Sequence, residues 1–146
     1  MKKTVKILGI IILAIVVALI AIVILPFIKA SVIDNMALNK YRSRILNELE
    51  LPTDTEIVET VSGCGNTGGT GNHTELLVSV LVKSELDEDA FFAYYPHAYE
   101  AEERDFETWA MGCVGLSFNK PEEEGNYYIL EYIKSAPCSD FDLRGH

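Results

Sequence analysis

The feature that most constrains this chain is an apolar run near its N-terminus. Residues 7–28 read ILGIIILAIVVALIAIVILPFI and include no charged residue. As a helix rising about 1.5 Å per residue, the run extends roughly 33 Å, which spans a hydrocarbon core of about 30 Å. The rest of the chain is too small to surround an apolar helix of this length, so a buried core helix is disfavoured. The run therefore predicts one transmembrane helix.

The flanks of this run favour an uncleaved signal-anchor over a cleaved signal peptide. Residues 1–6 form a basic flank, but the run exceeds the about 7–15 apolar residues of a signal peptide. The best cleavage candidate, residues 28–30, matches A-x-A poorly. Basic residues close to the membrane favour a cytoplasmic N-terminus, although Lys and Arg are no fewer after the run. We expect a single-pass protein of the cell membrane that contacts the bilayer through residues 7–28 and places its C-terminal domain outside.

The charge of the chain changes along its length. The net charge is −10, and all 22 acidic residues follow the apolar run. This distribution argues against a broad basic surface for nucleic acid or anionic lipid, so we expect no nucleic-acid partner. It suits a domain that its charge keeps soluble, or one that meets cationic partners.

Periodic patterns after the membrane helix predict an α+β architecture. Apolar residues recur about every four positions over residues 31–51 and stop at Pro52, which predicts an amphipathic helix. This helix either continues the membrane helix as a stalk or packs on the domain. Strands are expected where apolar and β-branched residues alternate, over residues 55–62, 74–84, 106–118 and 127–135.

A short helix completes the expected domain. It covers residues 85–95, and Ser84 and Asp87 resemble a capping box at its start. The resulting order, β-β-α-β-β, fits two hairpins in an antiparallel sheet with a helix on one face, which is a small two-layer α+β domain. We expect this domain to occupy residues 52–135 and to be followed by a C-terminal tail, residues 136–146.

A glycine-rich segment, SGCGNTGGTGNH, lies between the first two expected strands. Its spacing matches G-x-G-x-x-G, but dinucleotide binding requires a helix after the glycines, and an alternating strand follows here. We therefore predict no cofactor. The segment is either a wide hairpin loop or a loop that binds a partner. The residues that would contact a partner are Gly65, Asn66, Gly68, Gly69, Gly71 and Asn72.

The reactive side chains do not form a convergent catalytic set in the sequence. Two of the three cysteines are expected to pair outside the cytosol, and Cys64 with Cys113 is favoured because both fall in or beside expected strands. Three reduced thiols are the alternative. The sequence has no Cys-x-x-Cys and no G-x-S-x-G motif. We expect no metal ion and no enzymatic activity.

One stretch resembles known proteins. Residues 51–86 read LPTDTEIVETVSGCGNTGGTGNHTELLVSVLVKSEL. They resemble a group of single-pass membrane-anchored proteins of Gram-positive anaerobes that share the N-terminal helix, the glycine–asparagine loop and the strand ending in Lys-Ser. The resemblance implies a bacterial setting. No activity is assigned to that group, so it implies no site residue.

These observations lead to two functional hypotheses. The first is a membrane-anchored extracytoplasmic binding or interaction module that contacts a protein, a peptide or a cell-wall component. The alternative is an accessory subunit that assembles with a larger membrane complex through its transmembrane helix.

Overall fold

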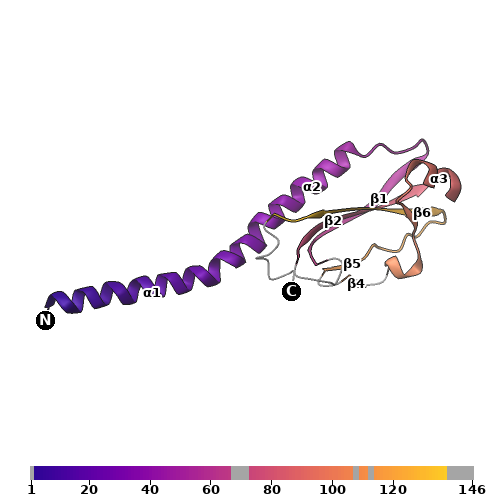
Figure 1. Ribbon diagram of the computed structural model, residues 1–146. Coiled ribbons are helices and arrows are strands. Elements are labelled where there is room, and N and C mark those ends of the chain that lie inside the picture. The colour runs from indigo at the N-terminus through magenta and orange to yellow at the C-terminus, as the bar shows by residue number, and fades with distance from the viewer. Residues whose placement is uncertain (1, 67–72, 107–108, 112–113, 138–146) are drawn as a thin grey trace.

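The computed structural model describes residues 2–66, 73–106, 109–111 and 114–137. It consists of a long helical arm and an α+β domain built on a four-stranded antiparallel sheet (Figure 1). The predicted α+β class with an N-terminal apolar helix is thus confirmed, whereas the order β-β-α-β-β is not.

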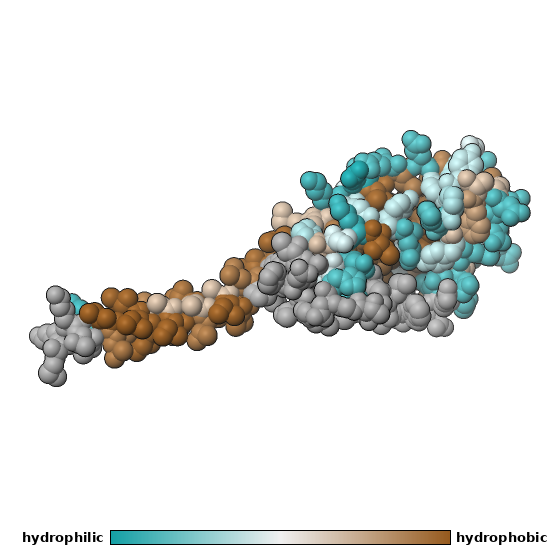
Figure 2. All heavy atoms as spheres, in the orientation of Figure 1, coloured by the Kyte–Doolittle hydropathy of each residue, from teal (hydrophilic) through white to brown (hydrophobic). Residues whose placement is uncertain are grey.

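The arm begins with α1 (Lys2–Ile28). Within it, residues 6–25 are long and apolar enough to cross a membrane, and none of this span is buried against the other residues that the structure describes. Figure 2 shows hydrophobic side chains along the arm and mostly hydrophilic ones over the domain. This separation is what an aqueous domain on a membrane helix requires.

The helix continues past Pro26 and bends. A π-helical segment, η1 (Lys29–Asp34), leads directly into α2 (Asn35–Glu48), and the arm changes direction in this region (Figure 1). Proline has no N–H to donate to the carbonyl four residues earlier in the helix, which bends the helix there. A π-helical turn is a second cause of bending. The two causes of a bend therefore lie in the last turn of α1 and in η1.

Helix α2 is both an extension of the arm and a cover for the sheet. The amphipathic helix expected over residues 31–51 is observed as η1 and α2. Its buried Leu38 packs in one cluster with Val78 and Val80 of the sheet, and Tyr41 and Ile45 contact the same cluster. The two placements that the sequence left open are therefore combined in one helix.

The main sheet has the strand order β1-β2-β6-β3. Strands β1 (Thr55–Gly65) and β2 (Glu75–Ser84) form the predicted first hairpin, which extends to the pair Gly65 and Glu75. Strand β6 (Asn126–Ser135) pairs with β2 along its full length, and β3 (Tyr99–Glu100) pairs with β6 at the edge.

The prediction of one strand over residues 106–118 is wrong. This region contains the end of a 3-10 helix, η2 (Glu103–Phe106), followed by β4 (Trp109–Met111) and β5 (Val114–Leu116). Strands β4 and β5 pair with each other in a separate sheet, and β6 takes β2 as its partner instead. Alternation predicts that a segment is extended, but it does not specify which strand it pairs with.

Helix α3 (Glu88–Tyr94) is shorter than expected and has a different cap. The Asp87 side chain accepts a hydrogen bond of 2.9 Å from the backbone N–H of Ala90. The expected cap, Ser84, instead lies 2.7 Å from the Thr55 hydroxyl and accepts a bond from the N–H of Leu86. The serine therefore ties β2 to β1, and the aspartate begins the helix.

Each face of the sheet supports its own core, because successive residues of a strand point to opposite faces. The first face carries Val78, Val80 and Val82 beneath α2 and α3. The second face carries Leu81 and Ile129, which are buried with Phe118 beneath the segment after β3. The candidate site lies on this second face.

Candidate functional site

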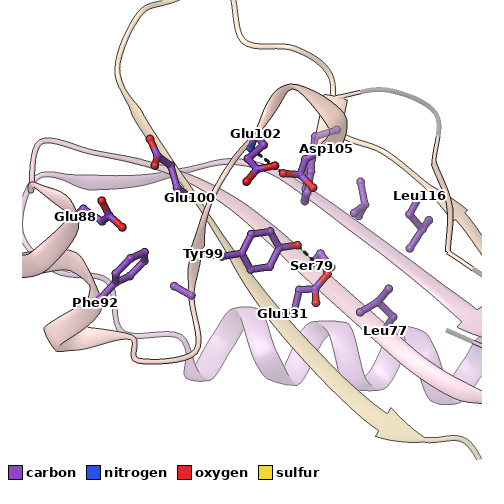
Figure 3. A pocket seen from close by; sticks show the side chains of 13 residues that line it. Leu77, Ser79, Glu88, Phe92, Tyr99, Glu100, Glu102, Asp105, Leu116 and Glu131 are labelled. Atoms are coloured by element: carbon purple, nitrogen blue, oxygen red, sulfur yellow. Dashed lines mark hydrogen bonds between the residues drawn. The ribbon is translucent and has the colours of Figure 1, made fainter. Parts of the chain in front are cut away.

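The candidate site is a cavity of about 660 Å³ that lies between the second face of the sheet and the segment that covers it, and that also reaches Glu88 and Phe92 of α3 (Figure 3). Strands β1, β2, β3, β5 and β6 contribute to it, together with α3 and the region of η2. Its lining residues are Val61, Leu77, Ser79, Glu88, Phe92, Ala98, Tyr99, Glu100, Glu102, Asp105, Leu116, Phe118 and Glu131. Its volume is within the usual range for small-molecule sites, about 300–1,000 Å³.

The floor of the cavity is a row of three residues across three strands. Val61 of β1 is paired with Ser79 of β2, and Ser79 is paired with Glu131 of β6. Ser79 is only 4% exposed, although it lies on a central strand with Leu77 and Leu81 on the same face. The strand register therefore places one hydroxyl and one carboxylate side by side on an otherwise apolar floor.

The Glu131 carboxylate is held by two hydroxyl groups. The Tyr99 hydroxyl donates to Oε1 of Glu131 at 3.0 Å, and the Ser79 hydroxyl lies 3.4 Å from the same atom. Figure 3 shows Tyr99 extending from β3 across the sheet toward Ser79 and Glu131. Because Oε1 accepts both contacts, the orientation of the carboxylate is restricted.

The wall opposite the floor is stabilised by a local turn. The Asp105 side chain accepts a hydrogen bond of 2.8 Å from the N–H of Glu102, and the N–H of Asp105 donates to the carbonyl of Glu102 at 2.9 Å. The N–H of Phe118 donates to the carbonyl of Asp105 at 3.1 Å, which joins the turn to the residues after β5. The N–H of Ala101 donates to the Tyr127 carbonyl at 2.8 Å and fixes the same segment to β6.

The electrostatic character of the cavity is acidic. Among the described residues, the charged side chains that line it are Glu88, Glu100, Glu102, Asp105 and Glu131. Apolar walls come from side chains such as Leu77, Phe92 and Leu116, and in Figure 3 the acids of α3 and β3 lie toward the end opposite Leu77 and Leu116. Negative charge beside apolar surface favours a ligand that combines a positive charge with an apolar body.

The acids do not form a metal centre in the part of the chain that the structure describes. No three His, Cys, Asp or Glu side chains gather there in a way that could hold an ion.

The two predicted loop residues that the structure describes, Gly65 and Asn66, do not line this cavity. Gly65 ends β1 opposite Glu75, and Asn66 follows it as a buried residue; neither lines the cavity. Gly68, Gly69, Gly71 and Asn72 lie outside the described residues. The first two glycines of the motif, Gly63 and Gly65, lie in strand β1, and the next described element is strand β2. Dinucleotide binding requires a helix at this position.

The predicted disulfide remains a prediction. Cys64 is buried in the core beneath α2, near Leu76 and Ala136 of the same cluster. Cys113 lies outside the residues that the structure describes.

The sequence patterns alone do not identify two central residues of the cavity, Ser79 and Glu131. Ser79 interrupts the apolar run LLVSVLV, and Glu131 interrupts YYILEYI. Each polar residue within an apolar strand was a recognisable signal. Their pairing depends on the register between β2 and β6, which connects residues far apart in the chain.

No protein-family model, no curated protein and no solved structure matches the chain. Function is therefore inferred from the geometry and the charge of the site.

Proposed function

We propose that this protein is a single-pass membrane-anchored binding domain that takes a small cationic ligand into the cavity on the second face of its sheet. The observation that carries this proposal is the Glu131 carboxylate, held by Tyr99 and Ser79 on the floor of an acidic cavity. An ammonium group donates several hydrogen bonds and accepts none, so it complements this carboxylate.

The shape of the cavity supports a ligand with an apolar body. Val61 and Leu77 flank the polar pair on the floor, while Phe92, Leu116 and Phe118 line the remaining walls. Burial of apolar ligand surface against these side chains would supply affinity, and the oriented carboxylate would supply selectivity. A small organic amine combines both properties.

The anchoring part of the proposal rests on α1. The helix is exposed along its apolar length, and no described residue of the domain covers it. The basic residues at its start favour a cytoplasmic N-terminus and an extracytoplasmic domain. The cavity would then sample ligands outside the cell.

A titration with matched ligands tests the binding proposal. The full-length protein in detergent micelles would be titrated with benzylamine and with benzyl alcohol near neutral pH, and binding would be followed by calorimetry. We expect benzylamine to bind and Glu131→Gln to weaken that binding about tenfold, because one hydrogen bond to a charged group is lost. Glu85→Gln serves as a control, because Glu85 is exposed and does not line the cavity. Equal binding of the alcohol, or equal effects of both substitutions, would contradict the proposal.

The second candidate function is that of an accessory subunit that assembles through α1. Its support is that the apolar side chains of α1 are exposed on every side and could pack on other membrane helices. Replacing residues 7–28 with a polyleucine segment separates the two functions. Loss of assembly with retained benzylamine binding favours the accessory subunit, whereas an unchanged phenotype in cells removes it.

A further inference from the structure

A second concave surface lies on the first face of the sheet. It is a groove of about 450 Å³ between the last turn of α2 and α3, and it shares no lining residue with the acidic cavity. Tyr94, Tyr95 and Tyr132 line it. Tyr94 is 65% exposed, so the tyrosine groove is accessible from solvent.

The tyrosine groove adjoins an apolar cluster on the first face of the sheet, against which Tyr41, Tyr95 and Tyr132 pack. Burial raises the pKa of Tyr132, and so does the neighbouring Tyr41. Burial also raises the pKa of Tyr95, with further contributions from Tyr132 and Glu50. The three tyrosines come from α2, β6 and the end of α3, and all of them pack against the same apolar cluster.

One tyrosine of this cluster already contacts an ammonium group. Nζ of Lys134 lies 5.9 Å from the centroid of the Tyr41 ring. This distance is within the range of a cation–π interaction, about 6 Å. The same protein therefore shows a lysine side chain placed over a tyrosine ring of this cluster.

The charge of the tyrosine groove complements a second ammonium group. Glu48 and Glu50 line it, and no basic side chain does so in the described part of the chain. Arg44 lies 3.0 Å from Glu48 and offsets part of that charge, whereas Glu50 is exposed. Tyr95 donates a hydrogen bond to the carbonyl of Glu50, which fixes this ring beside the acid.

The groove lies at the end of α2 that is farther from α1, where a partner protein has access to it. Helix α2 has 14 residues, so its last turn lies about 20 Å along the helix from the end nearest α1. Ile45 and Leu49 of the last turns provide apolar walls on which the methylene stem of a lysine can pack.

We propose that the tyrosine groove binds the side chain of a lysine presented by a peptide segment of a partner protein. The ammonium group lies over the rings of Tyr94 and Tyr132 near Glu50, and the stem packs against Leu49. This site is separate from the acidic cavity, and it does not depend on a ligand in that cavity.

Spectroscopy on the full-length protein tests this proposal. Isotope-labelled tyrosine would be incorporated, and ring resonances would be followed in detergent micelles during titration with the peptide acetyl-Gly-Lys-Gly-amide. The matched peptide carries norleucine in place of lysine, which keeps the apolar stem and removes the charge. We expect the lysine peptide to shift the resonances of Tyr94 and Tyr132, and the norleucine peptide to leave them unchanged.

Two pairs of variants locate the site. Tyr94→Ala removes an exposed ring and is expected to weaken binding about two- to fivefold, whereas Tyr94→Phe keeps a ring and retains most of the affinity. Glu50→Gln is expected to weaken binding, whereas Glu85→Gln, an exposed acid outside the groove, is not.

The outcomes are distinct. Equal shifts with the norleucine peptide, or unchanged affinity in Tyr94→Ala, would overturn the lysine site. Shifts confined to Tyr99 would place the peptide in the acidic cavity, which would also overturn this inference while leaving the proposed function intact. Shifts at Tyr94 and Tyr132 in a protein that fails to bind benzylamine would support the groove and contradict only the cavity.

Discussion

At the scale of single residues, an aromatic group joins α3 to the sheet. The rings of Phe91 and Tyr128 stack with centroids 4.0 Å apart and an interplanar angle of 8°, and Phe92 meets Tyr128 edge to face. The Tyr128 hydroxyl donates to the Leu86 carbonyl at 3.2 Å. Because Phe92 also lines the acidic cavity, this packing positions one wall of the site.

The buried Tyr128 predicts a loss of stability at alkaline pH. Burial raises the pKa of Tyr128, and the negative charges of Glu100, Glu88 and Asp87 raise it further. The unfolded chain releases this proton near pH ~10, before the folded protein does, so the stabilisation is complete below that pH and falls as the pH rises through the folded pKa.

The measurement is the free energy of unfolding between about pH 8 and about pH 11, the range around the ordinary pKa of a tyrosine. Tyr128→Phe should lower stability at neutral pH, because the bond to Leu86 is lost, and should flatten the alkaline decline. The burial of Tyr41, Tyr95 and Tyr132 also raises their pKa, so part of the decline remains. An identical slope in the variant would show that Tyr128 does not contribute.

At the scale of elements, α2 determines how the arm and the domain are joined. Its start continues from α1 through η1, and its apolar side covers the first face of the sheet. The sequence of residues 31–51 predicts this helix well, since its apolar period is clear. The apolar periodicity shows that one side of the helix is apolar, but it does not identify the surface that covers this side. The packing of α2 on the sheet could therefore not be predicted from the sequence.

Substitution on the two sides of α2 tests this arrangement. Leu38 is buried beneath the helix, whereas Met36 is 66% exposed. Leu38→Ala should lower the free energy of unfolding by about 2–5 kcal/mol, because a buried side chain leaves a cavity. Met36→Ala should change it by less than about 0.5 kcal/mol. Chemical denaturation followed by circular dichroism gives both values, and similar effects of the two substitutions would refute the packing of α2.

The pairing of the strands, which is also a property of the elements, determines where the candidate site forms. The first hairpin follows from alternation and a connecting loop rich in turn residues, so it could be predicted from the sequence. The pairing of β6 with β2 could not, because residues 85–125 separate the two strands and the segment over 106–118 has the same alternating pattern. The choice of β6 as the neighbour of β2 is what brings Glu131 to Ser79.

At the scale of the whole molecule, an exposed apolar helix is joined to a polar domain (Figure 2). In water, the uncovered α1 would promote aggregation, whereas in a bilayer lipid covers it. The exposure of α1 along residues 6–25 and its apolar composition are compatible with single-pass membrane anchoring.

Charge placed in the middle of α1 tests this association. The double substitution Leu13→Lys and Val17→Lys should move the protein from the membrane fraction to the soluble fraction or to aggregates, because each lysine at the centre of a membrane helix costs about 2.5–3.5 kcal/mol. Ile57→Lys is the matched control, because Ile57 is 41% exposed on the domain. Cell fractionation with immunodetection measures the distribution. Retention of the double variant in the membrane would contradict a spanning α1.

The sequence by itself determined the apolar helix, the amphipathic helix after it, the first hairpin and the acidic character of the domain. Each depends on neighbouring residues, whose periodicity and composition are readable along the chain. The tertiary structure decided the partner of β2, the separate β4–β5 hairpin and both concave surfaces. These depend on which distant segments meet: Ser79 is paired with Glu131, and Tyr95 and Tyr132 line one groove. Local periodicity carries no information on such pairings.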